Sequence, residues 1–443
     1  MAAERRQPRP RRPHTRRDGD TLLRRRAVRL RARGVATLAL GAFSFVLGYV
    51  LQRPELLVVA SAAFLLVVVG LLVVRIRRPQ FEIVRLFSPP VVAADGLTRV
   101  TVRVRNIAST ASTQLRWNDA IPWQSSTTPH ELPSIPVGSA ARRVRSVDYE
   151  LTPPRRGIYP IGPFVVEFED PFGMATSVQA VGNADRLIVV PGVVELPTGG
   201  PTLADGEGTA QLVQRRITGN DDDLTTREYR WGDALRRVHW RASARHGELM
   251  VRQEEPRSHP DARIIVDTRQ GGYSDAVPDP GDTWSPSAHS QAFEWVIKMT
   301  ASLGAHLEAS GFRVGIEETG MPQVEALGDQ RQGGRRSEGF LTSLAGVRLL
   351  DRSRDTIGKA VVTDADGPVF ALLGDPEDET VAWVLRRRRP GQAAVVFVVD
   401  ARPEVHRRFT EAGWQCIGVD DDADLGEAWR SAANETGYVR GAH

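Results

Sequence analysis

One short segment near the middle of the chain holds the densest set of side chains that could carry out chemistry. Within 19 residues it carries arginines, carboxylates and one imidazole, namely Arg227, Glu228, Asp233, Arg237, His239 and Arg245. Burial can bring the pKa of a carboxylate or an imidazole towards neutrality, so Glu228 or Asp233 with His239 would suit general acid/base catalysis. The arginines would equally suit recognition of a phosphate group, or bidentate pairing with the carboxylates.

Of these three interpretations we favour the paired charge network, in a bracing or docking role. Tyr229 and Trp240 would supply apolar area to it, and Gly232 would permit a tight turn. Catalysis has less support, because the sequence around Ser243 lacks the G-x-S-x-G pattern and the chain has neither an H-E-x-x-H motif nor a phosphate-binding P-loop. We therefore predict no catalytic residue, no ATPase activity and no cofactor.

The order of residues in this segment resembles a known family. The run TREYRWGD, continuing as RRVHWRASAR and then LMVR, is similar to the hallmark of domain of unknown function 58 across residues 227–252. The residues that match the hallmark, and that we assign to docking, are Arg227, Glu228, Tyr229, Gly232, Asp233, Arg237, His239, Trp240, Ser243, Ala244 and Arg245.

Three upstream runs also resemble this family: Arg156-Gly157-Ile158-Tyr159, Gly162-Pro163 and Asp170-Pro171-Phe172-Gly173. The resemblance implies a von Willebrand factor A-like domain at the C-terminus. It also implies a MoxR-type AAA+ ATPase as partner, often together with a membrane transglutaminase-like protein. These partners follow from the resemblance alone.

A-type domains bind a divalent cation through an Asp at the end of the first strand and through hydroxyls two and four residues later. The corresponding run here is Asp267-Thr268-Arg269-Gln270-Gly271. Arg269 places a cation where the first hydroxyl is expected, and Gly271 offers no ligand at the second. We therefore predict a degenerate, metal-free site, with Asp267 and Thr268 left as ligands only if an atypical site exists.

The N-terminal part of the chain carries the features of a membrane anchor. Two uncharged apolar segments, residues 34–51 and 56–74, each provide about 19 residues, which as helix would cross a hydrocarbon core of roughly 30 Å. Thirteen arginines precede the first segment and three follow the second closely, but only Arg53 lies between them. This bias predicts two spans with both termini in the cytoplasm; the reversed topology is the alternative. A second span so close to the first argues against a cleaved signal peptide.

The charge of the chain is divided between the anchor and the remainder. Residues 1–78 carry 17 basic and four acidic side chains, and the whole chain has a net charge of +4, so the remaining residues sum to −9. This balance argues against a nucleic-acid-binding body, and the basic head is suited to anionic lipid. A nucleic-acid-binding tail at the N-terminus is the alternative. Cys416, the sole cysteine, excludes an intramolecular disulfide, and its apolar surroundings in the sequence favour a core position.

The pattern of apolar and polar residues in the soluble part changes near residue 200. Before it, apolar residues alternate with polar ones, as at Val100, Val102 and Val104, which predicts a β-sandwich resembling an immunoglobulin-like module. Beyond residue 260, apolar runs such as 262–266 and 393–399 alternate with helical patterns such as 291–310, which predicts a doubly wound, mostly parallel α/β sheet.

The predicted organisation is therefore a multidomain chain. Residues 1–33 form a basic head, expected to be disordered, and residues 34–78 a transmembrane helical hairpin. Residues 79–200 form the β-sandwich, 201–260 the signature connector and 261–443 the α/β domain. The predicted function is that of a cytoplasm-facing, membrane-anchored adaptor or scaffold, possessing no enzymatic activity, in cell-envelope processes or the maturation of protein complexes.

Two rival functions remain open at this point. The first is a cell-envelope enzyme that uses Glu228, Asp233 and His239. The second is a membrane-linked sensor whose β-sandwich binds a ligand, which predicts an exposed aromatic patch including Trp117 or Trp123.

Overall fold

The computed structural model describes residues 27–76, 79–124, 128–139, 142–197, 226–228, 240–252, 260–278, 288–324, 336–350, 367–433 and 438–439. The chain divides into two compact units. The first consists of Met1–Val91, Leu97–Pro153 and Tyr159–Leu187, and the second of Val92–Gly96, Pro154–Ile158 and Ile188–His443.

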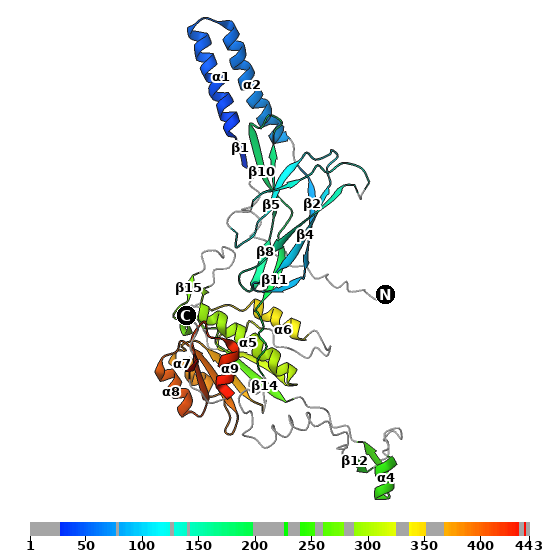
Figure 1. Cartoon of the computed structure of the whole chain (residues 1–443), viewed down its shortest axis with the longest axis vertical. Helices are drawn as coiled ribbons and strands as arrows, with labels where there is room; N and C mark the ends of the chain where they lie inside the picture. The colour runs from blue at the N-terminus through cyan, green and yellow to red at the C-terminus, as the bar shows by residue number, and fades with distance from the viewer. Residues whose placement is uncertain are drawn as a thin grey trace, which may run out of the picture. The chain divides into compact units, whose positions relative to one another are not determined.

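The first unit begins with two long apolar helices, α1 (Ala32–Val50) and α2 (Pro54–Ile76), which lie side by side as a hairpin (Figure 1). Both are long and apolar enough to cross a membrane. Glycines seven positions apart on α1, a spacing typical of helices packed side by side, face α2: the nearest neighbours of Gly41 lie at residues 60–64 and those of Gly48 at residues 56–57. A Cβ at Gly48 would lie 3.2 Å from the backbone nitrogen of Leu57, so glycine permits the close approach.

A short strand, β1 (Ala27–Leu30), immediately precedes the hairpin. It pairs antiparallel with β10 (Ala175–Val181), with Ala27 opposite Val178 and Leu30 opposite Ala175. The prediction of a disordered head over residues 1–33 is therefore wrong for these four residues. Residues 1–26 lie outside the described part of the chain. The physical reason is that β10 offers an otherwise open sheet edge, and an Ala-Val-Arg-Leu run can complete its hydrogen bonds.

The remainder of the first unit contains two antiparallel sheets, one in the order β1-β10-β9-β5-β6 and the other in the order β2-β4-β7. A further sheet has the order β3-β11-β8. The strands not yet delimited are β2 (Phe81–Ser88), β3 (Val91–Ala93), β4 (Thr98–Asn106), β5 (Leu115–Asp119), β6 (His130–Leu132), β7 (Val144–Leu151), β8 (Gly157–Ile161), β9 (Phe164–Glu169) and β11 (Asp185–Val190). The alternation predicted for β4 is confirmed, because Val100, Val102 and Val104 are all fully buried.

A buried ion pair joins the β1-β10-β9-β5-β6 sheet to the β2-β4-β7 sheet and makes them a sandwich. Arg85 on β2 donates from Nε and Nη2 to the two carboxylate oxygens of Asp119 on β5, at 3.0 and 2.7 Å. Tyr149 on β7 donates to the same carboxylate at 2.6 Å, and Arg85 also contacts Asp185 at 3.0 Å. Gly162 has a positive φ, and a Cβ there would lie 2.6 Å from the guanidinium. Glycine at this position therefore leaves room for Arg85.

The second unit contains a six-stranded sheet in the order β17-β14-β18-β19-β20-β21, and every neighbouring pair in it is parallel. Its strands are β14 (Asp261–Val266), β17 (Arg313–Glu318), β18 (Val369–Leu373), β19 (Ala394–Val399), β20 (Gln415–Val419) and β21 (Tyr438–Val439). The helices are α5 (Gln291–Ala309), α6 (Arg336–Ala345), α7 (Asp378–Leu385), α8 (Pro403–Glu411) and α9 (Leu425–Ala433). The predicted parallel α/β sheet is confirmed.

Two separate hydrophobic clusters lie on the two faces of this sheet. Ile264 and Val266 of β14 belong to a cluster with residues of α5, α6 and α9. Ile265, which points to the opposite face, belongs to a cluster with residues of α7 and α8. Helices therefore cover both faces, as a doubly wound sheet requires. Cys416 on β20 is buried in the second cluster, and burial raises the pKa of its thiol to about 12, so its predicted role in the core is confirmed.

The ion pair inside the sandwich generates the first prediction. We expect Asp119→Ala to lower the free energy of unfolding by about 3–5 kcal/mol, because it leaves the Arg85 guanidinium buried without its main partner. Chemical denaturation of the purified protein measures the change. Glu150→Ala is the matched control, since it removes the exposed pair with Arg99 and should cost under about 1 kcal/mol. Equal effects of the two variants would contradict the assigned importance of Asp119.

Candidate functional site

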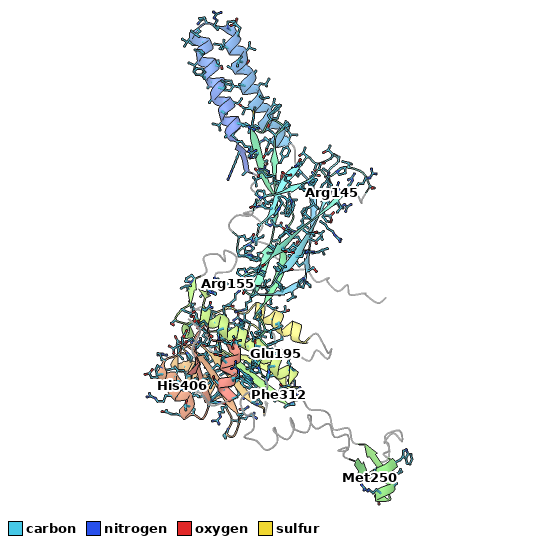
Figure 2. The ribbon with its side chains drawn as sticks, viewed as in Figure 1. Arg145, Arg155, Glu195, Met250, Phe312 and His406 are labelled. Atoms are coloured by element: carbon cyan, nitrogen blue, oxygen red, sulfur yellow. The ribbon has the colours of Figure 1, made fainter. Side chains whose placement is uncertain are left out.

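The described part of the signature segment is a small strand-helix-strand structure. Strand β12 (Thr226–Glu228) pairs antiparallel with β13 (Met250–Arg252), placing Arg227 opposite Val251 and Glu228 opposite Met250. Helix α4 (Trp240–His246) precedes β13. The hydroxyl oxygen of Ser243 accepts a hydrogen bond from the backbone N–H of Met250 at 2.8 Å, and thereby fixes α4 to β13. Figure 2 labels Met250, whose side chain is 9% exposed.

The structure brings together only part of the predicted docking motif. Arg227 and Glu228 are placed by their backbone in β12. Tyr229, Gly232, Asp233, Arg237 and His239 lie outside the described residues, so the proposed acid/base grouping is untested.

The exposed side of α4 carries three residues of the same motif. Trp240, Ala244 and Arg245 are exposed, and 70% of the Trp240 surface is open. The expected packing of Trp240 in a network with Tyr229, Asp233, Arg237 and His239 involves residues outside the described ones and stays a prediction. Ser243 turns towards β13, whereas Trp240 is presented outwards on the same short helix.

A second candidate lies at the carboxyl edge of the parallel sheet, the edge at which doubly wound folds bind ligands. Asp267 follows β14 and is fully buried. Its Oδ1 accepts from the hydroxyl of Thr319 at 2.6 Å and from the backbone N–H of Arg269 at 3.1 Å. Thr268, also buried, accepts from the backbone N–H of Gly320 at 3.3 Å. Asp267 and Thr268 are thus held by protein donors.

Arg269 directs its guanidinium to the start of α7. It donates to the Thr380 hydroxyl at 3.0 Å and lies 3.5 Å from the carboxylate of Glu377 and 3.6 Å from that of Glu379. Only 6% of Arg269 is exposed, so this edge of the sheet contains a buried positive charge supplied by the protein.

Two glycines let the chain turn tightly around this charge. A Cβ at Gly272 would lie 2.4 Å from Oδ2 of Asp267, and one at Gly271 would lie 2.6 Å from Oε1 of Glu377. Both positions form the 3-10 turn η3 (Gln270–Gly272). Gly271 was expected only to lack a metal ligand; its contact with Glu377 gives a steric reason for the residue.

Aspartates recur along the same edge, and the sequence reasoning did not recognise them as a set. Asp267, Asp400 and Asp420 directly follow β14, β19 and β20, and Asp375 comes two residues after β18. Parallel strands bring such positions to one edge, so strand-end aspartates were the signal that could have identified them. Within the described part of the chain, no three carboxylates converge as metal ligands would.

A shallow open hollow at this edge is lined, among others, by Asp275, Asp375 and Asp400. Asp375 is paired with Arg402 at 2.8 Å, and Asp275 accepts from the backbone N–H of Gln291 at the start of α5, at 2.6 Å. Asp400 has left-handed backbone (φ 49°). Partial burial, and then the negative charges of Asp421, Asp420, Asp275 and Asp422, raise the pKa of Asp400 to about 6.

The acidic run before α9 has two different roles. Asp424 accepts from the backbone N–H of Glu427 at 2.9 Å, as a helix cap does. Asp421 and Asp422 contribute instead to the negative potential around Asp400.

The two tryptophans that the sensor interpretation names are buried to different degrees. Trp117 is 3% exposed and stacks on Phe164 with ring centroids 4.9 Å apart. Trp123 is half-buried and meets Tyr159 edge to face. Trp117 therefore belongs to the core of the sandwich and does not contribute to an exposed patch.

Comparisons with known proteins identify the signature segment. Residues 225–320 match the sequence model of the family described as "Protein of unknown function DUF58". Over this segment, the chain belongs to the DUF58 family. The match spans β12, α4, β13 and the start of the α/β sheet, and leaves the hairpin and sandwich uncovered. A comparison with curated proteins finds no match.

Solved structures give only distant likenesses to this DUF58 chain. The crystal structure of the CARDB domain of PF1109 from Pyrococcus furiosus, in complex with di-metal ions, is 17% identical, with coverage of 24% of this chain and 89% of that one and a TM-score of 0.17. A cycloisomaltooligosaccharide glucanotransferase from Paenibacillus sp. is 10% identical over 77% of this chain and 53% of that one, with a TM-score of 0.18. At these TM-scores the likenesses carry no argument about fold or function.

The buried guanidinium generates the second prediction. We expect Arg269→Ala to lower the free energy of unfolding by about 1–3 kcal/mol, because hydrogen bonds of a buried charged group are lost while Glu377 and Glu379 can return to water. Differential scanning calorimetry measures the loss. Arg402→Ala, which removes an exposed arginine from its pair with Asp375, serves as control and should change stability little. A negligible effect of Arg269→Ala would show that its contacts do not hold the edge together.

The raised pKa of Asp400 generates the third prediction. Between its ordinary value of 3.8 and about 6, the folded protein binds this proton more tightly than the unfolded chain does, so Asp400 makes the free energy of unfolding fall as pH rises through that window. Asp400→Asn removes this contribution, and its stability relative to the wild type should therefore increase from pH 4 to pH 7.

Urea denaturation at several pH values measures this change. Asn tolerates left-handed backbone as Asp does, and Asp95→Asn, at φ 60°, controls for that conformation. A stability difference between Asp400→Asn and the wild type that stays constant with pH would refute the assigned titration.

Proposed function

We propose that this DUF58 chain is a membrane-anchored docking protein that faces the cytoplasm. The apolar hairpin holds it in the membrane, and the basic residues around the hairpin meet anionic lipid. The α/β unit, in a von Willebrand factor A-like role, and the signature segment bind a partner protein. By the family resemblance the partner is a MoxR-type AAA+ ATPase, with a membrane transglutaminase-like protein as a second associate.

The pairing of β1 with β10 supports the two-span arrangement. β1 precedes α1 and β10 follows α2, and strands that pair must lie on the same side of a membrane. A hairpin that crosses twice satisfies this condition. The excess of arginine at the two ends of the hairpin favours the cytoplasm as that side.

The buried charge of Arg269 supports a binding role for the α/β unit. In an A-type domain a metal ion supplies positive charge next to the Asp that ends the first strand. Here the Arg269 guanidinium, held by Thr380, Glu377 and Glu379, supplies such a charge within the protein itself. We infer that the unit binds its partner at this edge, where the Arg269 guanidinium is always ionised and needs no metal ion. The sandwich, in an immunoglobulin-like role, then acts as the spacer between the anchor and the docking unit.

The exposure of Trp240 is the observation that carries the docking proposal. A tryptophan that is 70% exposed on a short helix contributes little to folding, but tryptophan and arginine are the side chains most often found at the energetic centre of protein interfaces. Arg245 is exposed on the same helix. Ser243 fixes this helix to β13, so Trp240 is presented from a braced structure.

The fourth prediction tests this docking. We expect Trp240→Ala in the full-length protein, reconstituted in nanodiscs, to weaken binding of the purified MoxR-type ATPase of the same host by tenfold or more, as loss of about 2 kcal/mol at an interface centre would. Biolayer interferometry gives the dissociation constants. The unfolding free energy should remain unchanged, because the side chain is exposed.

Leu97→Ala is the matched control for this experiment. Leu97 is also a large exposed side chain, at 58%, but it lies outside the signature segment. If both variants bind as the wild type does, Trp240 is not a docking residue. If the wild type itself does not bind the ATPase, the proposed partner is wrong, and assays of the Glu228, Asp233 and His239 enzyme alternative become the next step.

A further inference from the structure

The turn between β9 and β10 is built as a rigid projection. The carboxylate of Asp170 accepts hydrogen bonds from the backbone N–H groups of Phe172, at 2.8 Å, and of Ala175. The backbone N–H of Gly173 donates to the carbonyl of Asp170 at 3.0 Å, and Gly173 has left-handed backbone (φ 69°). Although the turn is fixed in this way, 45% of the Phe172 side chain is exposed.

The same turn packs against the ends of both apolar helices. The backbone N–H of Arg31 donates to the carbonyl of Met174 at 2.8 Å, and a Cβ at Gly34 of α1 would lie 2.4 Å from that oxygen. On α2, a Cβ at Gly70 would lie 3.3 Å from the carboxylate of Asp170. Because Gly34 and Gly70 have no side chain, the turn can pack closely against both the start of α1 and the last turns of α2.

The positions of these two glycines fix the depth of the turn along the hairpin. Gly34 directly follows Arg33 and begins the uncharged part of α1. Gly70 precedes Arg75 by five residues, which corresponds to about 7.5 Å of helix. The turn therefore lies where the charged flanks of the hairpin give way to its apolar part.

We propose that this turn is a third membrane contact, in which Phe172 inserts into the headgroup region of the bilayer beside the foot of the hairpin. The inference rests on the membrane anchoring proposed above. Apolar side chains such as Phe insert at the boundary between headgroups and acyl chains, and Arg33, at the start of α1 beside the turn, carries a charge that anionic headgroups attract. A carboxylate at this depth is costly, and the two backbone N–H groups that bind Asp170 offset that cost. The bilayer contact would fix the sandwich against the membrane surface.

Nitroxide scanning of the full-length protein tests the inference. Single cysteines are introduced in a Cys416→Ala background, labelled, and reconstituted into vesicles of phosphatidylcholine and phosphatidylglycerol. Phe172→Cys and Pro171→Cys probe the turn, and Phe43→Cys, which is 66% exposed on α1, probes the hairpin. Leu97→Cys is the aqueous control. The measurement is the ratio of collision rates with oxygen, which concentrates in lipid, to those with a water-soluble nickel complex.

We expect this ratio to be severalfold higher at residues 172 and 171 than at 97, and highest at 43. If residue 43 gives a lipid-like ratio and both turn positions match residue 97, the inference is overturned while the anchor stands. If residue 43 itself matches residue 97, the membrane anchoring fails and the inference fails with it. Two labelled positions in the turn keep the test decisive if one variant does not fold.

Discussion

The antiparallel pairing of β1 with β10 is the constraint on which the arrangement of the first unit depends. Only Arg31 separates the end of β1 from the start of α1, so the strand has almost no freedom relative to the helix. Arg31 adds to the joint, because its side chain lies 2.7 Å from Glu169 at the end of β9. The sandwich and the foot of the hairpin are thus connected by a sheet edge, an ion pair and two glycine contacts. A membrane anchor built in this way would orient the sandwich instead of merely tethering it.

The family-like runs upstream of the signature segment prove to be structural devices. Gly162 leaves space for the Arg85 guanidinium, and Asp170 organises its turn. Arg156 lies with its side chain against the ring of Phe293, at 5.1 Å, and contacts Glu294 at 2.5 Å, both on α5. Each run therefore makes room for, or forms contacts with, a polar side chain that is buried or closely packed. Sequence features that resemble a family signature here have structural roles within the units in which they lie.

Local patterns in the sequence predicted most of the architecture, because burial on one face or both imposes a period on each element. The alternation in β4 and the apolar run of β19 are examples. The strand β1 escaped prediction because its partner lies about 150 residues away, and four residues amid arginines carry no period. The contact of Arg269 with α7 escaped for a similar reason. The sequence revealed that a cation replaced a hydroxyl, but only the fold brings Glu377, Glu379 and Thr380 to it.

The carboxyl edge of the sheet combines the Arg269 guanidinium with a row of aspartates. The charge of the arginine does not change with pH, whereas the charge of Asp400 does. Arg269 is always ionised, so its charge does not depend on the supply of a metal ion. Partial burial, and then the negative charges of neighbouring aspartates, raise the pKa of Asp400 to about 6, so part of this shift comes from repulsion between carboxylates. Asp375 is paired with Arg402, whereas Asp275, which accepts from the start of α5, still adds to the negative potential around Asp400. A partner that brought a positively charged side chain to the hollow beside Asp400 would relieve this repulsion, and binding there would then stabilise the α/β unit as well as hold the partner.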